Sequence, residues 1–336
     1  MTTVQMLVFG DINIDAVVTA REYPPEGGEA VVEKTDFRLG GSGCNTAVTL
    51  AKLGADAWLA GNLGTDPLGV MAMNYIRKAS LRESLIQQKE SHQTGFFCIV
   101  VTGNGERTMF GGRGCNTNPP DYKQAVEVMA GIDGLHISGY TLMDDAQFEV
   151  IARLIEAAHL QGKVISLDPG VFTSSQSKQR INAILPMIDY LMISQPELSD
   201  YSHPDDQQTV IKRLLDSGIK AMVLKMGAEG SQFIDQQGEI FQPAFQHTSH
   251  PIQDTTGAGD AFNAGFLFAR LRSLPVPDCL ALGNLCAFRS ITSPHGIVDV
   301  CLENDYPHSL NKLLLDCSTK ENEYESLLAF LNNNKA

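Results

Sequence analysis

Short apolar runs alternate along the chain with longer segments in which apolar residues recur at helical spacing. The runs predicted to form buried strands are 4–10, 57–64, 134–140, 163–169, 189–194 and 220–227. The segments predicted to form helices include 44–53, 67–79 and 144–161. In the last of these, Phe148, Ile151 and Ile155 fall on one helical face. Strands that alternate with helices favour βαβ units, so we expect an α/β fold with a mostly parallel sheet.

Two regions interrupt this alternation. The segments 29–38 and 94–110 have strand character without a helix between neighbouring strands, which is typical of a small antiparallel flap inserted into an α/β body. The polar C-terminal segment carries only a short apolar stripe. The predicted organisation is one domain over residues 1–317, β-lid insertions at about 11–40 and 92–115, and a C-terminal helix and tail over 318–336.

The charge and cysteine content exclude several classes of partner. Lys and Arg number 25 and Asp and Glu number 39, so the net charge is 25 − 39 = −14. Duplex nucleic acid and anionic membrane surfaces would repel such a chain, so we expect neither as a partner. We also expect no membrane span and no signal peptide. The seven cysteines include no C-x-x-C pair, which favours a reducing cytoplasm.

A glycine turn at residues 254–262, DTTGAGDAF, precedes an apolar run of helical spacing. The first N–H groups of a helix lack internal partners, and glycines let them converge into an anion hole that suits a phosphoryl group. Asp260 would lie beside that group and accept a proton from an attacking hydroxyl. Because the helix dipole favours negative charge there, we expect a low pKa for Asp260. The alternative is that this stretch is only a capped loop.

Two common nucleotide motifs are missing from the sequence. The chain contains no G-x-x-x-x-G-K-[ST], and Asp-Ile-Asn-Ile-Asp follows Gly10 in place of G-x-G-x-x-G. A P-loop enzyme and a dinucleotide-dependent oxidoreductase are therefore disfavoured.

A second polar cluster follows the first predicted strand. Asn13 and Asp15 lie just after it, and Asn45 follows two adjacent glycines. Ligands of open α/β sheets bind at the carboxyl ends of strands, and short amide and carboxylate side chains suit the vicinal hydroxyls of a sugar. Gly41 would let the backbone approach that ligand closely. Taken singly, each of these residues is more typical of a loop cap.

Together these motifs resemble the ribokinase-like, or PfkB, family of carbohydrate and nucleoside kinases over roughly residues 4–315. The stretches that carry the resemblance are GDINID (10–15), GGSGCNTAVTLAKLG (40–54), KMGAEG (225–230) and DTTGAGDAFNAGF (254–266). The resemblance implies a three-layer α/β/α sandwich with a small antiparallel β lid. It also implies transfer of the γ-phosphoryl group of ATP, with Mg²⁺, to a primary hydroxyl of a small sugar of ribose, fructose or sugar-acid type.

The family pattern assigns roles to individual positions. It implies that Asp260 is the base and that Gly257, Ala258 and Gly259 form the anion hole. The sugar-binding positions are Asn13, Asp15, Gly41 and Asn45. The nucleotide positions are Lys225, Gly227, Gly230, Asn284 and Ser194. Asp254 and Thr256, with the loop 292–297, fall on a monovalent-cation site, and the lid implies a homodimer.

The chain departs from the family pattern at three places. The family's Asn-x-x-Glu, which organises hydrated magnesium, is here Ser194-Gln195-Pro196-Glu197, so serine replaces the asparagine and Glu197 is kept to act on the metal through water. Of the family's Asp-Pro-Asn-x-Arg only Asp168 and Pro169 remain. The loop TSPHGI differs from the usual Thr-Arg-x-Gly-Ala, which leaves potassium dependence open.

The substrate stays open at this level. Arg113 would meet an anionic group of the substrate, or it is a solvated arginine of a turn. A nucleoside kinase would need an aromatic base pocket, which Phe96, Phe97 and Phe110 of the predicted lid could supply. The other alternative is a catalytically silent protein that binds a sugar or a nucleotide. The complete glycine turn disfavours a silent binding protein, whereas Ser194 favours one.

Overall fold

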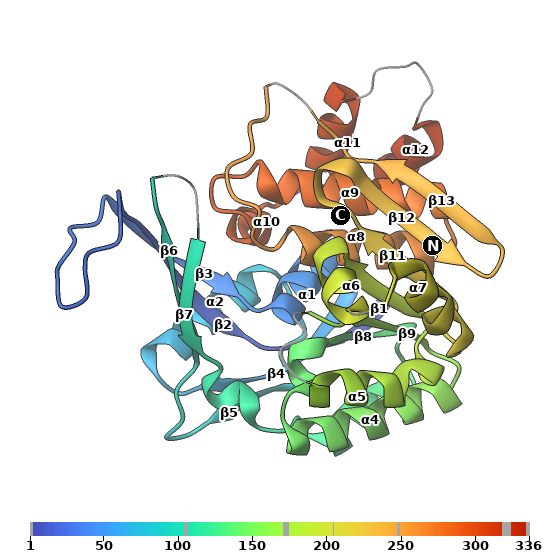
Figure 1. The fold of residues 1–336 in the computed structure, drawn as a ribbon, viewed down its shortest axis with the longest axis horizontal. Coiled ribbons are helices and arrows are strands. Elements are labelled where there is room, and N and C mark those ends of the chain that lie inside the picture. The colour runs from blue at the N-terminus through green and yellow to red at the C-terminus, as the bar shows by residue number, and fades with distance from the viewer. Residues whose placement is uncertain are drawn as a thin grey trace.

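The main body is built around a nine-stranded sheet (Figure 1). The computed structural model describes residues 3–103, 107–170, 175–203, 205–246, 249–317 and 324–333. The strands of this sheet, in spatial order, are β13 (Gly238–Pro243), β12 (Gly230–Asp235), β11 (Ala221–Lys225), β10 (Tyr190–Ser194), β9 (Val164–Asp168), β8 (Gly134–Ser138), β1 (Gln5–Phe9), β4 (Asp56–Gly64) and β5 (Ile86–Lys89). From β11 to β5 the neighbouring strands are parallel, and β12 and β13 add an antiparallel edge.

Helices cover both faces of this sheet, as Figure 1 shows. Successive side chains of a strand point to opposite faces, so Met6 and Val8 of β1 enter one core, and Leu7 and Phe9 enter the other. The first core is formed with α1 (Ser42–Lys52), α2 (Pro67–Lys78), α8 (Ala258–Leu271), α9 (Val276–Ile291), α10 (Ile297–Leu302), α11 (Tyr306–Cys317) and α12 (Glu325–Asn333). The second is formed with α3 (Tyr122–Met129), α4 (Asp145–Leu160), α5 (Ser175–Ile184), α6 (Gln195–Ser202) and α7 (Gln207–Asp216). The predicted three-layer α/β/α arrangement is confirmed.

A four-stranded sheet, which we call the lid, projects to one side of the body (Figure 1). Its order is β3 (Lys34–Gly40), β2 (Asn13–Thr19), β6 (Gly95–Val101) and β7 (Arg107–Gly112). Two of its strand pairs are antiparallel, as expected, but β2 and β6 are parallel, so the sheet is mixed. The register places Arg38, Asp15 and Phe97 in one row across β3, β2 and β6. Residues in one row share a face, so these three side chains lie on the same side of the lid.

Some element boundaries differ from the sequence prediction. The strand predicted over 29–38 begins only at Lys34 and runs on to Gly40. Val31, within the predicted strand, is 98% exposed, so no packing holds that segment in a sheet. Residues 104–106 lie outside the described residues. So does most of the predicted tail, of which only 324–333 is described, with α12 in it.

The helices over the described ranges fall short of a membrane span in length or in apolarity. The same ranges contain the short 3-10 helices η1 (Gly114–Thr117), η2 (Gly139–Leu142), η3 (Leu185–Met187) and η4 (Gly227–Glu229).

Candidate active site

The glycine turn lies at the start of α8, as the sequence predicts. Gly257 is the N-cap residue and has φ of 77°, a left-handed conformation that glycine adopts without strain. A Cβ atom at this position would lie 3.1 Å from the Ile297 side chain and 3.3 Å from Nδ2 of Asn45. Ala258, Gly259 and Asp260 form the first turn of the helix, where N–H groups lack helical partners. The Ala258 N–H already donates to the Thr255 oxygen at 3.3 Å, and the remaining N–H groups of this turn can serve as an anion hole.

Asp260 is held by two side chains from the start of α1. Ser42 Oγ donates to Oδ1 at 2.7 Å, and Asn45 Nδ2 donates to Oδ2 at 2.8 Å. Thr46 Oγ1 also donates to the Asp260 carbonyl oxygen at 3.3 Å. The two glycine-rich motifs therefore meet in space. Asn45, predicted to bind the sugar, orients the carboxylate of Asp260, and Ser42 is a site residue that the sequence did not indicate.

The pKa of Asp260 is raised to about 6, mainly because the group is buried, with the charge of Asp168 as the next cause. The hydrogen bonds from Ser42 and Asn45 lower the pKa by less than these two effects raise it. The predicted low pKa is therefore wrong, because burial outweighs the position at a helix N-terminus. A carboxylate with a pKa near 6 is ionised at neutral pH, yet it is a stronger base than an ordinary aspartate.

A buried ion pair lies behind the turn. Lys225 Nζ donates to Asp168 Oδ2 at 2.7 Å, and Asn263 Nδ2 donates to the same oxygen at 2.5 Å. Burial alone would raise the pKa of Asp168, but Lys225 reverses this and the pKa is lowered. A Cβ atom at Gly259 would lie 3.4 Å from Lys225 Nζ, so the ammonium group lies beside the anion hole. Asn263 carried no sequence signal beyond its place in the helix after the turn.

The residues predicted to bind the sugar lie where β2 and β3 meet α1. Asp15, on β2, has a pKa raised to about 7, mainly by burial, with the charges of Asp254 and Asp260 adding to the rise and Arg38 opposing it. A Cβ atom at Gly40 would lie 2.3 Å from Asp15 Oδ2. Gly41 has φ of 98°, and its Cβ would lie 2.0 Å from a backbone oxygen. Position 41 therefore requires glycine, and a larger residue at position 40 would displace the Asp15 side chain.

Asn13 is linked to Asn116, which the sequence did not indicate. Asn116 Nδ2 donates to Asn13 Oδ1 at 2.9 Å, and its Oδ1 accepts from the backbone N–H of Ile12 at 3.0 Å. The sequence shows Asn116 only as a short polar residue directly after the predicted lid insertion. A Cβ at Gly95 would lie 2.0 Å from Asn13 Oδ1, so the neighbouring lid strand β6 packs closely on this amide.

Arg113 is engaged by acidic side chains of the protein itself. Its Nε and Nη2 donate to the two carboxylate oxygens of Asp11 at 2.7 and 2.9 Å, and it also pairs with Asp144. Its Nη2 donates to Gln147 Oε1 at 2.9 Å, and its side chain is only 14% exposed. The solvated turn arginine is therefore excluded, and two carboxylates already offset the charge that an anionic substrate would need.

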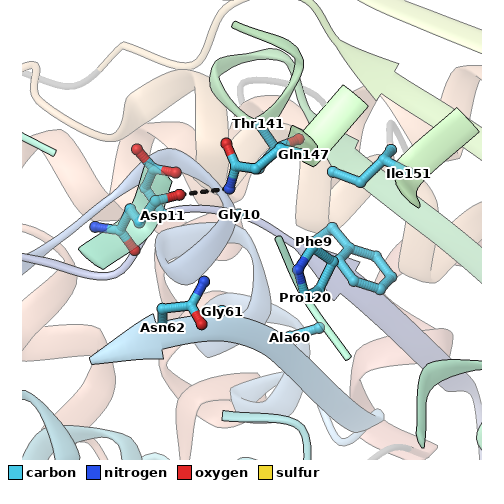
Figure 2. A pocket seen from close by; sticks show the side chains of 11 residues that line it. Phe9, Gly10, Asp11, Ala60, Gly61, Asn62, Pro120, Thr141, Gln147 and Ile151 are labelled. Carbon is cyan, nitrogen blue, oxygen red and sulfur yellow. Dashed lines mark hydrogen bonds between the residues drawn. The ribbon is translucent and has the colours of Figure 1, made fainter. Parts of the chain in front are cut away.

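Figure 2 shows the cavity next to this cluster, with Asp11, Asn62, Thr141 and Gln147 around it. Its volume is about 10 Å³, room for about one water molecule, so no sugar fits this cavity as it stands.

The predicted nucleotide residues lie around β11, β12 and α9. Gly227 has φ of 58°, and a Cβ there would meet no atom within 4 Å, so this backbone is open to a ligand. Gly230 has φ of 122° and packs against the Gln242 oxygen. Asn284 Nδ2 donates to the backbone oxygens of Gln242 and Pro243, both at 3.1 Å. Asn284 therefore positions β13.

Ser194 and Glu197 form a capping box at the start of α6. Ser194 N–H donates to Glu197 Oε2 at 2.7 Å, and Glu197 N–H donates to Ser194 Oγ at 3.4 Å. No cluster of three or more His, Cys, Asp or Glu side chains in the described ranges is arranged to hold a metal directly. Mg²⁺ usually keeps several waters and binds one or two carboxylates plus substrate phosphates, so Glu197 fits a metal held through water.

Asp254 and Thr256 lie together, but a protein cation already pairs with Asp254. Asp254 Oδ1 accepts from the Thr256 N–H at 2.8 Å, and Oδ2 accepts from Arg38 Nη1 at 2.7 Å. A second, monovalent cation does not fit this donor set, because a guanidinium already offsets the charge of the carboxylate.

The family model of pfkB family carbohydrate kinases matches residues 4–301. The chain belongs to this family. Curated relatives include the ATP-dependent ribose-1-phosphate kinase of Halopiger xanaduensis, 27% identical over 84% of this chain and 90% of that protein. A 2-dehydro-3-deoxygluconokinase of Haemophilus influenzae is 26% identical over 77% of this chain and 88% of that protein. This chain is accordingly a phosphotransferase with an alcohol group as acceptor.

Solved structures with the same fold include Arabidopsis thaliana ribokinase in complex with ribose and ATP. Its TM-score is 0.80 at 21% identity, over 94% of this chain and 99% of that one. The adenosine kinase of Sinorhizobium meliloti gives 0.74 at 21% identity, over 89% and 98%. Likeness at such identities shows the fold, and it confirms the predicted ribokinase-like architecture.

Proposed function

We propose that this pfkB-family kinase transfers the γ-phosphoryl group of ATP to a primary hydroxyl of a small neutral sugar. The observation that carries the proposal is Asp260, a partly buried carboxylate held by Ser42 and Asn45 directly behind a left-handed glycine turn. In that place it is oriented by donors on both oxygens and lies next to backbone N–H groups that suit a phosphoryl group.

The proposed step uses these groups in turn. The sugar hydroxyl oxygen attacks the γ-phosphorus, the bond from phosphorus to the β–γ bridging oxygen breaks, and the hydroxyl proton passes to Asp260. The N–H groups of Gly257 to Gly259 stabilise the charge on the transferring group. Lys225, beside Gly259, adds positive charge there. When bound, Mg²⁺ would neutralise phosphate charge, and Glu197 would hold it through water.

The charges around the sugar side favour a neutral substrate. Arg113 is paired with Asp11 and Asp144, and Arg38 is paired with Asp254. Asp15 adds a further carboxyl group. An anionic substrate would meet these carboxylates while both arginines are already engaged, which costs free energy. Bacillus subtilis ribokinase is a relative that is 26% identical to this chain. These charges favour a substrate of the kind that its name indicates over a sugar phosphate, the substrate that the name of the ribose-1-phosphate kinase indicates.

A nucleoside kinase is the second candidate. Phe97 lies in the same lid row as Asp15 and is half-buried, so its ring lies beside the sugar side and could pack on a base. The S. meliloti adenosine kinase has the same fold. A silent binding protein is disfavoured, because Ser42 and Asn45 both donate to the carboxylate of Asp260. With a pKa of about 6, this carboxylate is ionised at neutral pH and can accept a proton.

A substrate screen tests the proposal. Coupled ADP release would be measured with neutral aldoses and ketoses, sugar acids, phosphosugars and nucleosides. We expect the highest kcat/KM with a neutral sugar. Higher values with a sugar acid or phosphosugar would contradict the charge argument, higher values with a nucleoside would favour the second candidate, and no turnover at all would favour a silent binder.

Ser194→Asn tests the proposed metal shell. Asparagine is as good an N-cap as serine, so we expect the variant to unfold at the wild-type urea concentration. Its amide brings an additional donor and acceptor next to Glu197, so we expect the Mg²⁺ concentration for half-maximal turnover to change. A Mg²⁺ titration that matches the wild type would exclude Ser194 from the metal environment. Gln195→Asn, at the neighbouring position, serves as the control.

The remaining partner and location assignments stay predictions. A homodimer through the lid is supported by Phe37 and Phe110, which share one row of the lid sheet and are 46% and 58% exposed. The acidic charge supports the absence of nucleic acid and membrane partners, and a cytoplasmic location stays a prediction from cysteine usage.

A further inference from the structure

An ion pair joins the lid to the loop before the glycine turn. Arg38 lies on β3, and its Nη1 donates to Asp254 Oδ2 at 2.7 Å, across 216 residues of sequence. The two side chains are only 15% and 17% exposed, so water screens this pair weakly. A second contact, 3.5 Å from Nη2 to Asp36, keeps the guanidinium on the same side of the lid.

The carboxylate that Arg38 holds also shapes the turn. Asp254 Oδ1 accepts from the Thr256 N–H at 2.8 Å, and Gly257 follows at once with its left-handed φ. The N–H groups of Gln253 and Asp254 both donate to the Ile291 oxygen, at 2.8 and 3.3 Å. The positive charge of Arg38 is therefore linked, through Asp254, to the N–H of Thr256, the residue directly before the start of the predicted anion hole at Gly257.

We infer that Arg38 is the built-in cation of the glycine turn and replaces a bound monovalent ion at Asp254. The inference rests on the proposed function in one respect, namely that this turn receives a phosphoryl group. Arg38 acts on the turn through its bond to Asp254, so we treat it as a positioning residue. Because a tethered guanidinium does not dissociate, the turn keeps its shape at any potassium concentration, and the protein needs no added ion.

The removal of Arg38 should create an ion requirement that the wild type lacks. Arg38→Ala leaves the Asp254 carboxylate partly buried without its cation and opens space beside it. Potassium or free guanidinium, each at modest concentration, can then enter, whereas tetramethylammonium is too large. These three chloride salts at equal ionic strength are the probes.

Thermal melting without substrate is the first measurement. For the wild type we expect the same Tm in all three salts, and for Arg38→Ala we expect a Tm about 1–3 °C higher in potassium or guanidinium than in tetramethylammonium. Steady-state turnover is the second measurement. In tetramethylammonium, Arg38→Ala should be about 10- to 100-fold slower than the wild type and recover several-fold with potassium.

Two control variants distinguish a potassium dependence that arises at Asp254 from a general effect of losing a positive charge. Arg82→Ala removes an exposed arginine, 59% exposed and paired with Asp56, and should gain no dependence on the cation. Arg38→Ala combined with Asp254→Asn should lose the potassium effect, because the carboxylate is gone. If Arg38→Ala fails to fold, Arg38→Lys, which keeps the charge, must remain insensitive to potassium.

Potassium-specific stabilisation or activation of the wild type would overturn the inference. So would an Arg38→Ala protein that matches the wild type in every salt. The melting measurement does not depend on the reaction, so a protein that melts as described but phosphorylates no sugar would refute the proposed function alone.

Discussion

Asp260→Asn is expected to lower kcat by roughly 10²- to 10⁴-fold, the usual contribution of a general base. Asparagine fills the same space and can still accept from Ser42, so the fold and ATP binding should persist. Steady-state kinetics with the best sugar and calorimetric titration with ATP would test this. Asp56→Asn, at an exposed ion pair, is the matched control and should keep its kcat. A kcat of Asp260→Asn near that of the wild type would exclude Asp260 as the base.

The same variant should be more stable than the wild type above pH 6. Burial raises the pKa of Asp260 from 3.8 to about 6, so ionisation of this group costs free energy only in the folded state. The cost is absent below about pH 4 and complete above about pH 6, where the amide should gain about 1–3 kcal/mol in the free energy of unfolding. Urea unfolding at pH 5 and pH 8 would measure it. A gain that shrinks as the pH rises would contradict this assignment.

The wild-type rate should follow the same titration. Only ionised Asp260 accepts the proton, so kcat/KM should fall as the pH drops through about 6. Asp15 has a pKa of about 7 and therefore titrates in the same pH range. The apparent pKa values of the pH–rate profile thus belong to the pair of carboxyl groups.

Lys225→Met is expected to cost about 3–5 kcal/mol in the free energy of unfolding, because it leaves the charge of Asp168 buried and unpaired. The double variant with Asp168→Asn should recover most of this loss, since Asn263 can still donate to the amide oxygen. Urea unfolding of the two single variants and the double variant would give the coupling energy. Lys220→Met, at a 68% exposed lysine, is the control and should cost less than 1 kcal/mol. An equally small cost for Lys225→Met would mean that the pair contributes little.

The fold and the centre of the site could be predicted because their signals are local. The glycine turn precedes an apolar helix in the sequence, and the backbone conformation of this turn could be predicted from residues 254–262 alone. Asn13, Asp15 and Gly41 could be placed because strand ends and glycine pairs mark where an open sheet binds its ligand.

The ion pairs that set the charges of the site could not be predicted. Arg113 pairs with Asp11, which is 102 residues away in the sequence, and Arg38 pairs with Asp254, which is 216 residues away. No spacing rule indicates which carboxylate a lid arginine will reach once the lid packs on the body. The raised pKa of Asp260 could not be predicted for the same reason, because burial is a property of the assembled fold, whereas the helix dipole is a local one.

The most direct test of the proposed reaction is phosphorus NMR of ATP with the best neutral sugar, with the wild type and Asp260→Asn side by side. We expect the wild type to form ADP and one sugar phosphate ester in equal amounts, with the phosphorus coupled to two equivalent or nearly equivalent CH₂ protons of a primary position. We expect Asp260→Asn to form almost none. Inorganic phosphate as the only product, an ester at a secondary carbon, or equal product from both proteins would contradict the proposal.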